Sequence, residues 1–316
     1  MKILVTGSSG HLGEALMRTF AASGQDAIGV DVLPSPYTQV VGSVSEPDVV
    51  SQCMPGVDVV LHAATLHKPH VVSHSRQAFV DVNVTGTLNL LEASARHGVR
   101  AFIYTSTTST FGDALTPPPG APAAWITEDV VPIAKNIYGV TKVAAEDLCR
   151  LFHRNQRLPC LVLRTSRFFP EGDDVPEKRD AWDDHNLKVN ELLYRRVDVE
   201  DVVSAHLCAI EKAAALGFGR FIISATTPFT RDDAVGLGRD APAVLAGRIP
   251  GYQPIFAARG WKMLPALDRV YDNERARTLL GWQPRYDFRR ALQAVASGED
   301  WRSPLARAIG SKGYHR

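Results

Sequence analysis

Thr6-Gly7-Ser8-Ser9-Gly10-His11-Leu12-Gly13 is the stretch that decides the fold. It follows the apolar run 3–5 and precedes residues 12–20, whose apolar side chains recur at helical spacing. Glycines in such a loop allow a tight turn, close approach of the backbone to a pyrophosphate and close packing of a helix on a strand. The stretch therefore predicts a strand–loop–helix unit that holds a dinucleotide at the helix N-terminus.

An acidic residue, Asp31, ends the next apolar run and lies 18 residues beyond Gly13. A carboxylate at this place can bind the hydroxyls of the adenosine ribose. Its charge would repel a 2′-phosphate, and no arginine follows closely to offset that repulsion. We therefore expect NAD and not NADP as the cofactor. The alternative is an aspartate that only caps the turn at the strand end.

The rest of the first half of the chain alternates apolar runs with helical patterns. A long helical stretch, 77–97, is followed by Gly98 as the expected C-cap. The further strand-like runs are residues 57–62, 100–105, 161–164 and 220–224. Near-continuous apolar strands that alternate with helices indicate a parallel sheet covered on both faces. The expected fold is a doubly wound α/β (Rossmann) domain with its ligand at the carboxyl ends of the strands.

The alternation breaks beyond about Arg167. Residues 170–196 are polar and acidic, and residues 225–265 are rich in Pro, Gly and Ala. We interpret these parts as a smaller α+β lobe that contacts the substrate. The expected NAD-binding domain comprises residues 1–166 and 197–224, and the expected substrate lobe comprises residues 167–196 and 225–316.

Tyr138-Gly139-Val140-Thr141-Lys142 opens a helical pattern, which places Tyr138 and Lys142 one turn apart on the same face. A phenol has a pKa near 10 and is a poor base at neutral pH. A nearby ammonium and a positive nicotinamide ring would both favour the phenolate, so that Tyr138 could accept a proton from a substrate hydroxyl. A half-buried tyrosine beside a solvated lysine is the structural alternative.

Taken together, these motifs resemble the extended short-chain dehydrogenase/reductase superfamily, in its NAD-dependent epimerase/dehydratase group with members such as UDP-glucose 4-epimerase. The resemblance runs through about residue 166 and resumes near 197–202 and 272–282. Besides the glycine loop, Asp31 and the Tyr-Lys pair, it rests on His62-Ala63-Ala64 and Asn83-Val84-Thr85-Gly86-Thr87.

The resemblance implies a third catalytic residue, a Ser or Thr that bonds the reacting oxygen. Counting back from Phe111-Gly112 assigns this role to Thr107, with Ser106 as the competitor. The implied catalytic set is therefore Thr107, Tyr138 and Lys142. The implied contacts to NAD are Gly7, Ser9, Gly10, His11, Leu12, Gly13, Asp31, Val32, Ser43, Val44, Ala63, Ala64, Asn83, Thr105, Tyr138, Lys142 and Thr165.

Departures from the family pattern bear on the substrate. Dehydratases of the family have Asp-Glu after the catalytic Thr; Thr108 and Ser109 stand there instead, so dehydration is not expected. Arg167 replaces an Asn that bonds the diphosphate in nucleotide-sugar members, and a guanidinium suits a phosphate or a carboxylate equally. The expected substrate contacts are Thr107, Thr108, Arg167 and Arg196, although salt-bridged structural roles are equally open for the arginines.

Composition sets the wider expectations. The 316 residues have a formal net charge of +1, which gives no reason to expect a nucleic-acid partner. The four cysteines are widely spaced, so we expect free thiols, and we expect no metal, although His67, His70 and His74 lie close together. Without an apolar run long enough for a signal peptide or a membrane span, a cytoplasmic enzyme is expected.

Two enzyme functions remain open at this stage. One is an epimerase-type enzyme for a sugar or nucleotide sugar that uses NAD transiently. The other is an NAD-dependent dehydrogenase of a free sugar, sugar acid or other secondary alcohol. A non-catalytic NAD-binding protein is a third possibility, which the intact Tyr138 and Lys142 disfavour. The resemblance also implies a homodimer through the helices at 77–97 and 136–153.

Overall fold

The computed structural model describes residues 1–118, 120–173 and 175–313. Within them, a seven-stranded sheet has the order β3-β2-β1-β4-β5-β7-β8, and its neighbouring strands pair in parallel. Because the order reverses beside β1, the loop after β1 lies at the switch point where such sheets bind ligands. The strands are β1 Ile3–Thr6, β2 Ala27–Asp31, β3 Val40–Val41, β4 Val59–His62, β5 Ala101–Thr107, β7 Cys160–Thr165 and β8 Phe218–Ile223.

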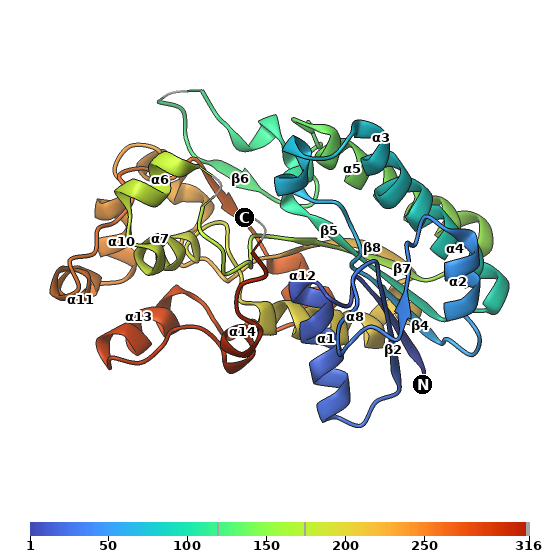
Figure 1. Cartoon of the computed structure of the whole chain (residues 1–316). Helices are drawn as coiled ribbons and strands as arrows, with labels where there is room; N and C mark the ends of the chain where they lie inside the picture. Colours follow the sequence, from blue (N-terminus) through green and yellow to red (C-terminus); the bar gives the residue numbers. More distant parts are fainter. Residues whose placement is uncertain (119, 174, 314–316) are drawn as a thin grey trace.

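Helices cover both faces of this sheet (Figure 1). Side chains alternate along each strand, so that Ile3 and Val5 belong to one apolar core and Leu4 to the other. Helices α1 (His11–Ala22) and α8 (Val199–Leu216) pack in the first core. Helices α2 (Pro47–Cys53), α4 (Gly86–His97) and α5 (Ile137–Gln156) pack in the second. The predicted doubly wound α/β fold is confirmed.

The helical stretch predicted at 77–97 consists of three consecutive segments. Helix α3 (Arg76–Val80) runs into a π-helical turn, Asp81–Thr85, and then into α4. Gly98 ends α4 in the left-handed conformation, with φ 68°, as expected of a glycine C-cap. The π-helical turn contains Asn83, whose side chain bonds Leu66 and Thr141.

A smaller lobe stands beside the sheet domain (Figure 1). Its apolar core gathers side chains from α7, α10, α11 and α13, together with Val270. A short parallel pair, β6 (Ala124–Ile126) with β9 (Arg269–Tyr271), adds a second sheet. The helices are α6 Pro176–Ala181, α7 Asp184–Glu191, α9 Ala234–Leu237, α10 Ala241–Arg248, α11 Tyr252–Ala258 and α13 Phe288–Ala296.

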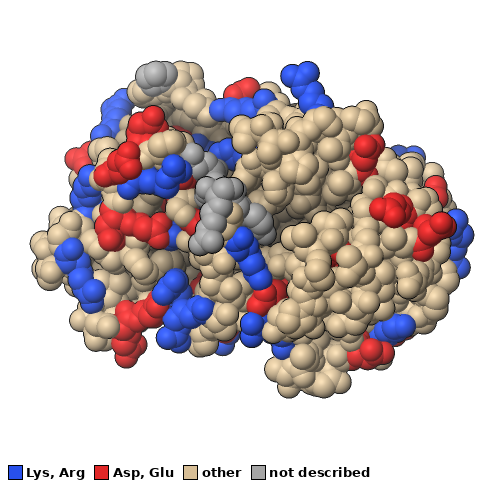
Figure 2. Space-filling view, in the orientation of Figure 1, with Lys and Arg blue, Asp and Glu red and all other residues tan. Residues whose placement is uncertain are grey.

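The C-terminal part of the chain returns to the sheet domain. Helix α12 (Glu274–Leu279) leads to Trp282, which is fully buried in the core beneath α8 and donates to the hydroxyl of Ser204 at 2.9 Å. Helix α14 (Pro304–Ile309) packs against the same core near α1. Figure 2 shows acidic and basic side chains interspersed over the lobe, with a hollow between the lobe and the sheet domain. Of the helices in the described ranges, none combines the length and apolarity needed to cross a membrane.

Candidate active site

The glycine loop is packed too tightly for side chains. A Cβ on Gly13 would lie 1.9 Å from the carbonyl oxygen of Gly7, and a Cβ on Gly7 would lie 2.8 Å from the backbone nitrogen of Ala64. Helix α1 begins directly after Gly10, which offers no side-chain cap to its first N–H groups. This arrangement suits the pyrophosphate of a dinucleotide, because the uncapped helix N-terminus favours an anion.

Asp31 lies at the end of β2, beside the glycine loop. One carboxylate oxygen accepts from the backbone N–H of Ser9 at 3.0 Å, and the other accepts from Leu33 at 2.9 Å. The carboxylate therefore caps the turn and also joins the loop to β2. Both readings of Asp31 are compatible with this geometry, because each oxygen keeps a lone pair for a ribose hydroxyl.

A buried hydrogen-bond chain supports the loop from below. The backbone N–H groups of Ala63 and Ala64 donate to the hydroxyl of Thr6, which bonds Nδ1 of His62 at 2.8 Å. On its other side, Nε2 of His62 bonds the hydroxyl of Thr87, which donates to the Asn83 carbonyl. Burial lowers the pKa of His62 to about 3, so the ring is neutral, with its proton on Nε2. The sequence did not single out Thr6 or Thr87.

Asn83 joins the loop after β4 to the catalytic helix. Its Oδ1 accepts from the backbone of Leu66 at 2.8 Å and from the hydroxyl of Thr65, and its Nδ2 donates to the Leu66 carbonyl and to Thr141 Oγ1 at 3.1 Å. The side chain therefore ties the loop after β4 to α5. Direct contact with NAD stays a prediction for Asn83.

The other expected cofactor contacts lie around the same edge of the sheet. Val44 is buried against Gly86, Ser43 bonds Ser45, and Val32 is exposed just beyond Asp31. The hydroxyl of Thr165 donates to the carbonyl of Ser106 on β5 at 3.0 Å. His11 begins α1, and its side chain pairs with Glu171 at 3.1 Å. Its contact with NAD stays a prediction.

Tyr138 and Lys142 face the carboxyl end of β5 from the first turns of α5, whose N-cap is Asn136. Burial raises the pKa of the Tyr138 phenol to about 12, and the nearby Thr107 side chain opposes the rise. Lys142 is almost completely buried. Its ammonium donates to the carbonyl of Thr105 at 2.7 Å and lies 4.2 Å from the centre of the Tyr104 ring.

Two opposing effects set the pKa of Lys142. Burial lowers its pKa to about 7, and the negative charge of Glu146 opposes that lowering. The sequence predicted the Tyr–Lys pair but not the burial that makes its lysine titrate in the neutral range.

The two candidate hydroxyls, Thr107 and Ser106, have different partners. Thr107 ends β5, lies near the Tyr138 phenol and accepts from the backbone of Ser109 at 3.1 Å. Ser106 donates instead to the carboxylate of Glu146 at 2.6 Å. The structure thus brings Thr107, and not Ser106, to the phenol. Thr108 follows as the buried first residue of a 3-10 turn, Thr108–Phe111.

The arginines expected to contact substrate are held by carboxylates. Arg196 is buried and donates to Glu191 at 2.8 Å and to the Phe169 carbonyl. Arg167 bonds Asp173 at 2.9 Å and lies 3.9 Å from Glu191. The salt-bridged role left open by the sequence is present in the structure. Contact of either guanidinium with a substrate stays a prediction, and it is sterically easier for the partly exposed Arg167.

The histidines after β4 form an aromatic group beside the loop that follows β7. His67 stacks on Phe169 with ring centroids 5.3 Å apart, and His70 lies between His67 and His74. In the part of the chain that the structure describes, no group of three or more His, Cys, Asp or Glu side chains is arranged to hold a metal ion.

Sequence reasoning missed Glu146, whose carboxylate lies in the core between Ser106, Arg164 and Arg220. A signal was present, because Arg164 stands within an otherwise apolar strand and a buried guanidinium needs an acidic partner. Glu146 also follows Lys142 by one helical turn, which puts it on the same face of α5.

A parallel sheet with a side-chain-free loop at its switch point, and a tyrosine and a lysine at the carboxyl edge, defines an NAD-dependent enzyme of the dehydrogenase/reductase class. The chain belongs to the NAD-dependent epimerase/dehydratase family, whose model matches residues 3–223.

Full-length relatives within this family differ in activity. The chain is 25% identical to a 3-beta-hydroxysteroid dehydrogenase of Mycolicibacterium neoaurum, covering 92% of this chain and 89% of the relative. It is 24% identical to a UDP-glucose 4-epimerase of Azospirillum brasilense, covering 99% and 95%. A short-chain dehydrogenase/reductase superfamily protein of Agrobacterium tumefaciens, solved with bound NAD, superposes with a TM-score of 0.68 at 23% identity, covering 98% and 97%. The cofactor of the chain is NAD.

Proposed function

We propose that the protein is an epimerase-type enzyme that oxidises and re-reduces a secondary alcohol of a sugar or nucleotide sugar. The observation that supports this most is the meeting of the Tyr138 phenol and the Thr107 side chain at the carboxyl end of β5, where the buried Lys142 ammonium donates to the Thr105 carbonyl. The hydroxyls of Tyr138 and Thr107 can both bond the same substrate oxygen, and the buried Lys142 can stabilise the phenolate form of Tyr138.

The chain's own residues account for the proton movement. Tyr138 accepts the proton of the substrate hydroxyl, and Lys142 in its ammonium form stabilises the phenolate that accepts it. Thr107 donates to the same oxygen as it becomes a carbonyl. When bound, NAD supplies the hydride acceptor for the carbinol carbon and, in an epimerase, returns the hydride to the other face of the ketone.

Asp31 and the glycine loop fit the cofactor that this chemistry needs. The loop leaves no room for side chains, and the uncapped start of α1 favours the pyrophosphate. The carboxylate of Asp31 favours ribose hydroxyls over a 2′-phosphate. The UDP-glucose 4-epimerase among the full-length relatives supports a nucleotide sugar as the substrate.

A specific observation favours the second candidate, an NAD-dependent dehydrogenase of a free sugar, sugar acid or other secondary alcohol. Arg167 stands where nucleotide-sugar members of the family have an Asn, and it is engaged with Asp173. A 3-beta-hydroxysteroid dehydrogenase is also among the relatives. The arginine fits a carboxylate as well as a diphosphate.

One experiment separates the two candidates. The purified chain is incubated with NAD and with UDP-hexoses, UDP-uronic acids, free aldoses or free uronic acids. Absorbance at 340 nm follows NADH, and NMR of the sugar follows inversion of configuration at the carbon that bears the reacting hydroxyl. We expect an inverted product with no net NADH. NADH formed in proportion to an oxidised free sugar or sugar acid would contradict the epimerase and establish the dehydrogenase.

A further inference from the structure

Glu146 lies at the centre of a buried polar cluster that the proposed proton transfer does not use. It is on α5, one turn beyond Lys142 and two turns beyond Tyr138, and its side chain is completely buried. Its carboxylate accepts from Arg164 at 2.7 Å and from Arg220 at 2.9 Å. Two guanidinium groups and one carboxylate form a paired network, as a buried charge requires.

The cluster also touches the active site. The Ser106 hydroxyl donates to Glu146 at 2.6 Å, which is a short charge-assisted bond. Ser106 stands between Thr105, whose carbonyl accepts a hydrogen bond from the Lys142 ammonium, and Thr107, whose side chain lies near the Tyr138 phenol. The Glu146 carboxylate therefore anchors the end of β5 at the residue between these two contacts.

We propose that Glu146 is a positioning residue of the active site: its charge keeps Lys142 in the ammonium form, and its bond to Ser106 holds the strand end that presents Thr107. The proposal rests on the roles given above to Tyr138, Lys142 and Thr107. Glu146 itself touches neither cofactor nor substrate, and it acts through its neighbours.

The groups around Lys142 determine whether a substitution raises or lowers its pKa. Helix α5 contributes Tyr138, Glu146 and Cys149, and the strands contribute the Tyr104 ring and the neutral His62. Of these, Glu146 and Cys149 raise the pKa of Lys142, while burial lowers it.

Arg164 and Arg220 are both bonded to Glu146. Their positive charges offset that of Glu146, with Asp147 bonded to the outer side of Arg220 at 3.0 Å. Loss of the Glu146 charge should therefore destabilise the ammonium, whereas loss of the Arg220 charge should stabilise it.

Two variants with opposite expected signs test the proposal. The titration of Lys142 is followed by NMR of the full chain with ¹³C-labelled lysine side chains, and its signal is assigned by its loss in Lys142→Ala. In Glu146→Gln we expect the midpoint to move down by about one pH unit. In Arg220→Gln we expect it to move up. Glu92→Gln, at an exposed acid on α4 outside this ion-pair network, is the control, and the midpoint of Lys142 should stay unchanged in it.

Opposite shifts would support the proposal, and no shift or shifts of one sign would overturn it. A purely structural Glu146 would lower stability in both variants without moving the midpoint in opposite directions. Should Glu146→Gln fail to fold, Arg220→Gln decides alone, because Arg220 is partly exposed on the edge strand β8. The titration needs no substrate. Absent turnover on every sugar would thus overturn the proposed function while leaving this result intact.

Discussion

Thr107 and Ser106 are neighbours with the same functional group, and the backbone sends them to different partners. Side chains alternate along β5, and Ser106 lies on the same face as Phe102 and Tyr104, where it donates to Glu146 on α5. Thr107 is the last residue of the strand, and its side chain meets the phenol of Tyr138. The catalytic role proposed for Thr107 therefore rests on its place at the end of β5, which the sequence alone did not determine.

We expect Thr107→Val to lower kcat by about 10²-fold, because the variant keeps the shape of the side chain but loses the donor to the developing charge. The matched change, Ser106→Ala, should lower kcat by less than about tenfold, because the Ser106 hydroxyl donates to Glu146 and not to the reacting oxygen. Steady-state kinetics with the substrate found in the sugar screen measures both. A larger loss for Ser106→Ala would transfer the catalytic role to Ser106.

Asp31 is the residue on which we expect the choice between NAD and NADP to depend. We expect Asp31→Asn to narrow the preference for NAD over NADP by about tenfold, because removing the carboxylate removes its repulsion of the 2′-phosphate. Calorimetric titration of both cofactors measures the ratio of their Kd values. Asp48→Asn, at an exposed acid on α2, is the control. An unchanged ratio in Asp31→Asn would leave Asp31 with its turn-capping role only.

At the scale of the element, the parallel strands were predictable and the small second sheet was not. Strands β1, β4, β5 and β7 are apolar runs that their sequence makes obvious. By contrast, β6 and β9 have three residues each and pair across more than a hundred residues. Such short runs have no periodicity to recognise, because their pairing depends on the tertiary packing around them.

The residues of the candidate site also divide into those that the sequence predicts and those that it does not. The glycine loop, Asp31 and the Tyr–Lys pair are local patterns with fixed spacing, and they could be predicted. The chain from Ala63 through Thr6 and His62 to Thr87 joins segments that are distant in sequence, as does the pairing of Glu146 with Arg164 and Arg220. Only the folded structure brings these residues together.

Helix α7 depends on an ion-pair network around Glu191. Burial alone would raise the pKa of this carboxyl, but the charges of Arg196, Arg195 and Arg167 hold it at about 2. We expect Glu191→Gln to lower the free energy of unfolding by about 3 kcal/mol, because it leaves buried guanidinium groups without their partner. Urea unfolding at neutral pH measures the change, with Glu177→Gln on the exposed side of α6 as control.

The ion pairs of Glu191 also make the free energy of unfolding depend on pH. The pKa of Glu191 is depressed in the folded state from an ordinary value of 4.5. Its stabilisation is therefore present above about pH 4.5 and is lost as the pH falls toward 2. In the native chain the free energy of unfolding should fall across this window. The slope should be smaller in Glu191→Gln, and an equal slope would show that Glu191 is not responsible.

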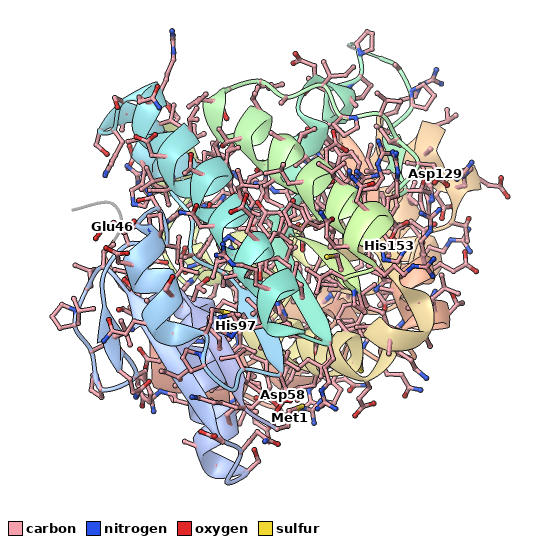
Figure 3. All side chains as sticks on the ribbon, turned by 90° about the vertical axis from the view of Figure 1, so that its right-hand side faces the viewer. Met1, Glu46, Asp58, His97, Asp129 and His153 are labelled. Carbon is pink, nitrogen blue, oxygen red and sulfur yellow. The ribbon has the colours of Figure 1, made fainter. Side chains whose placement is uncertain are left out.

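At the scale of the whole molecule, α4 and α5 lie side by side on one outer face (Figure 3). On α5, Val140 and Leu151 are 52% and 42% exposed. Exposed apolar side chains on the helices implied as a dimer interface support association of two copies through this face.

We expect a homodimer of twice 34.5 kDa by sedimentation velocity. The double change Val140→Glu with Leu151→Glu should shift the species to 34.5 kDa, because charges would then be buried against each other. Leu279→Glu, at an equally exposed leucine on α12, is the control and should remain dimeric. A native chain that sediments as a monomer would contradict the predicted dimer.

The central claim is that Tyr138, supported by Lys142, moves the proton while NAD takes the hydride. Tyr138→Phe tests it most directly, because this change removes only the phenolic oxygen and leaves the ring. Turnover on the identified substrate and the Kd of NAD are measured on the same preparation. The account predicts a loss of turnover of at least about 10²-fold with NAD affinity nearly unchanged. Retained turnover in Tyr138→Phe would contradict it.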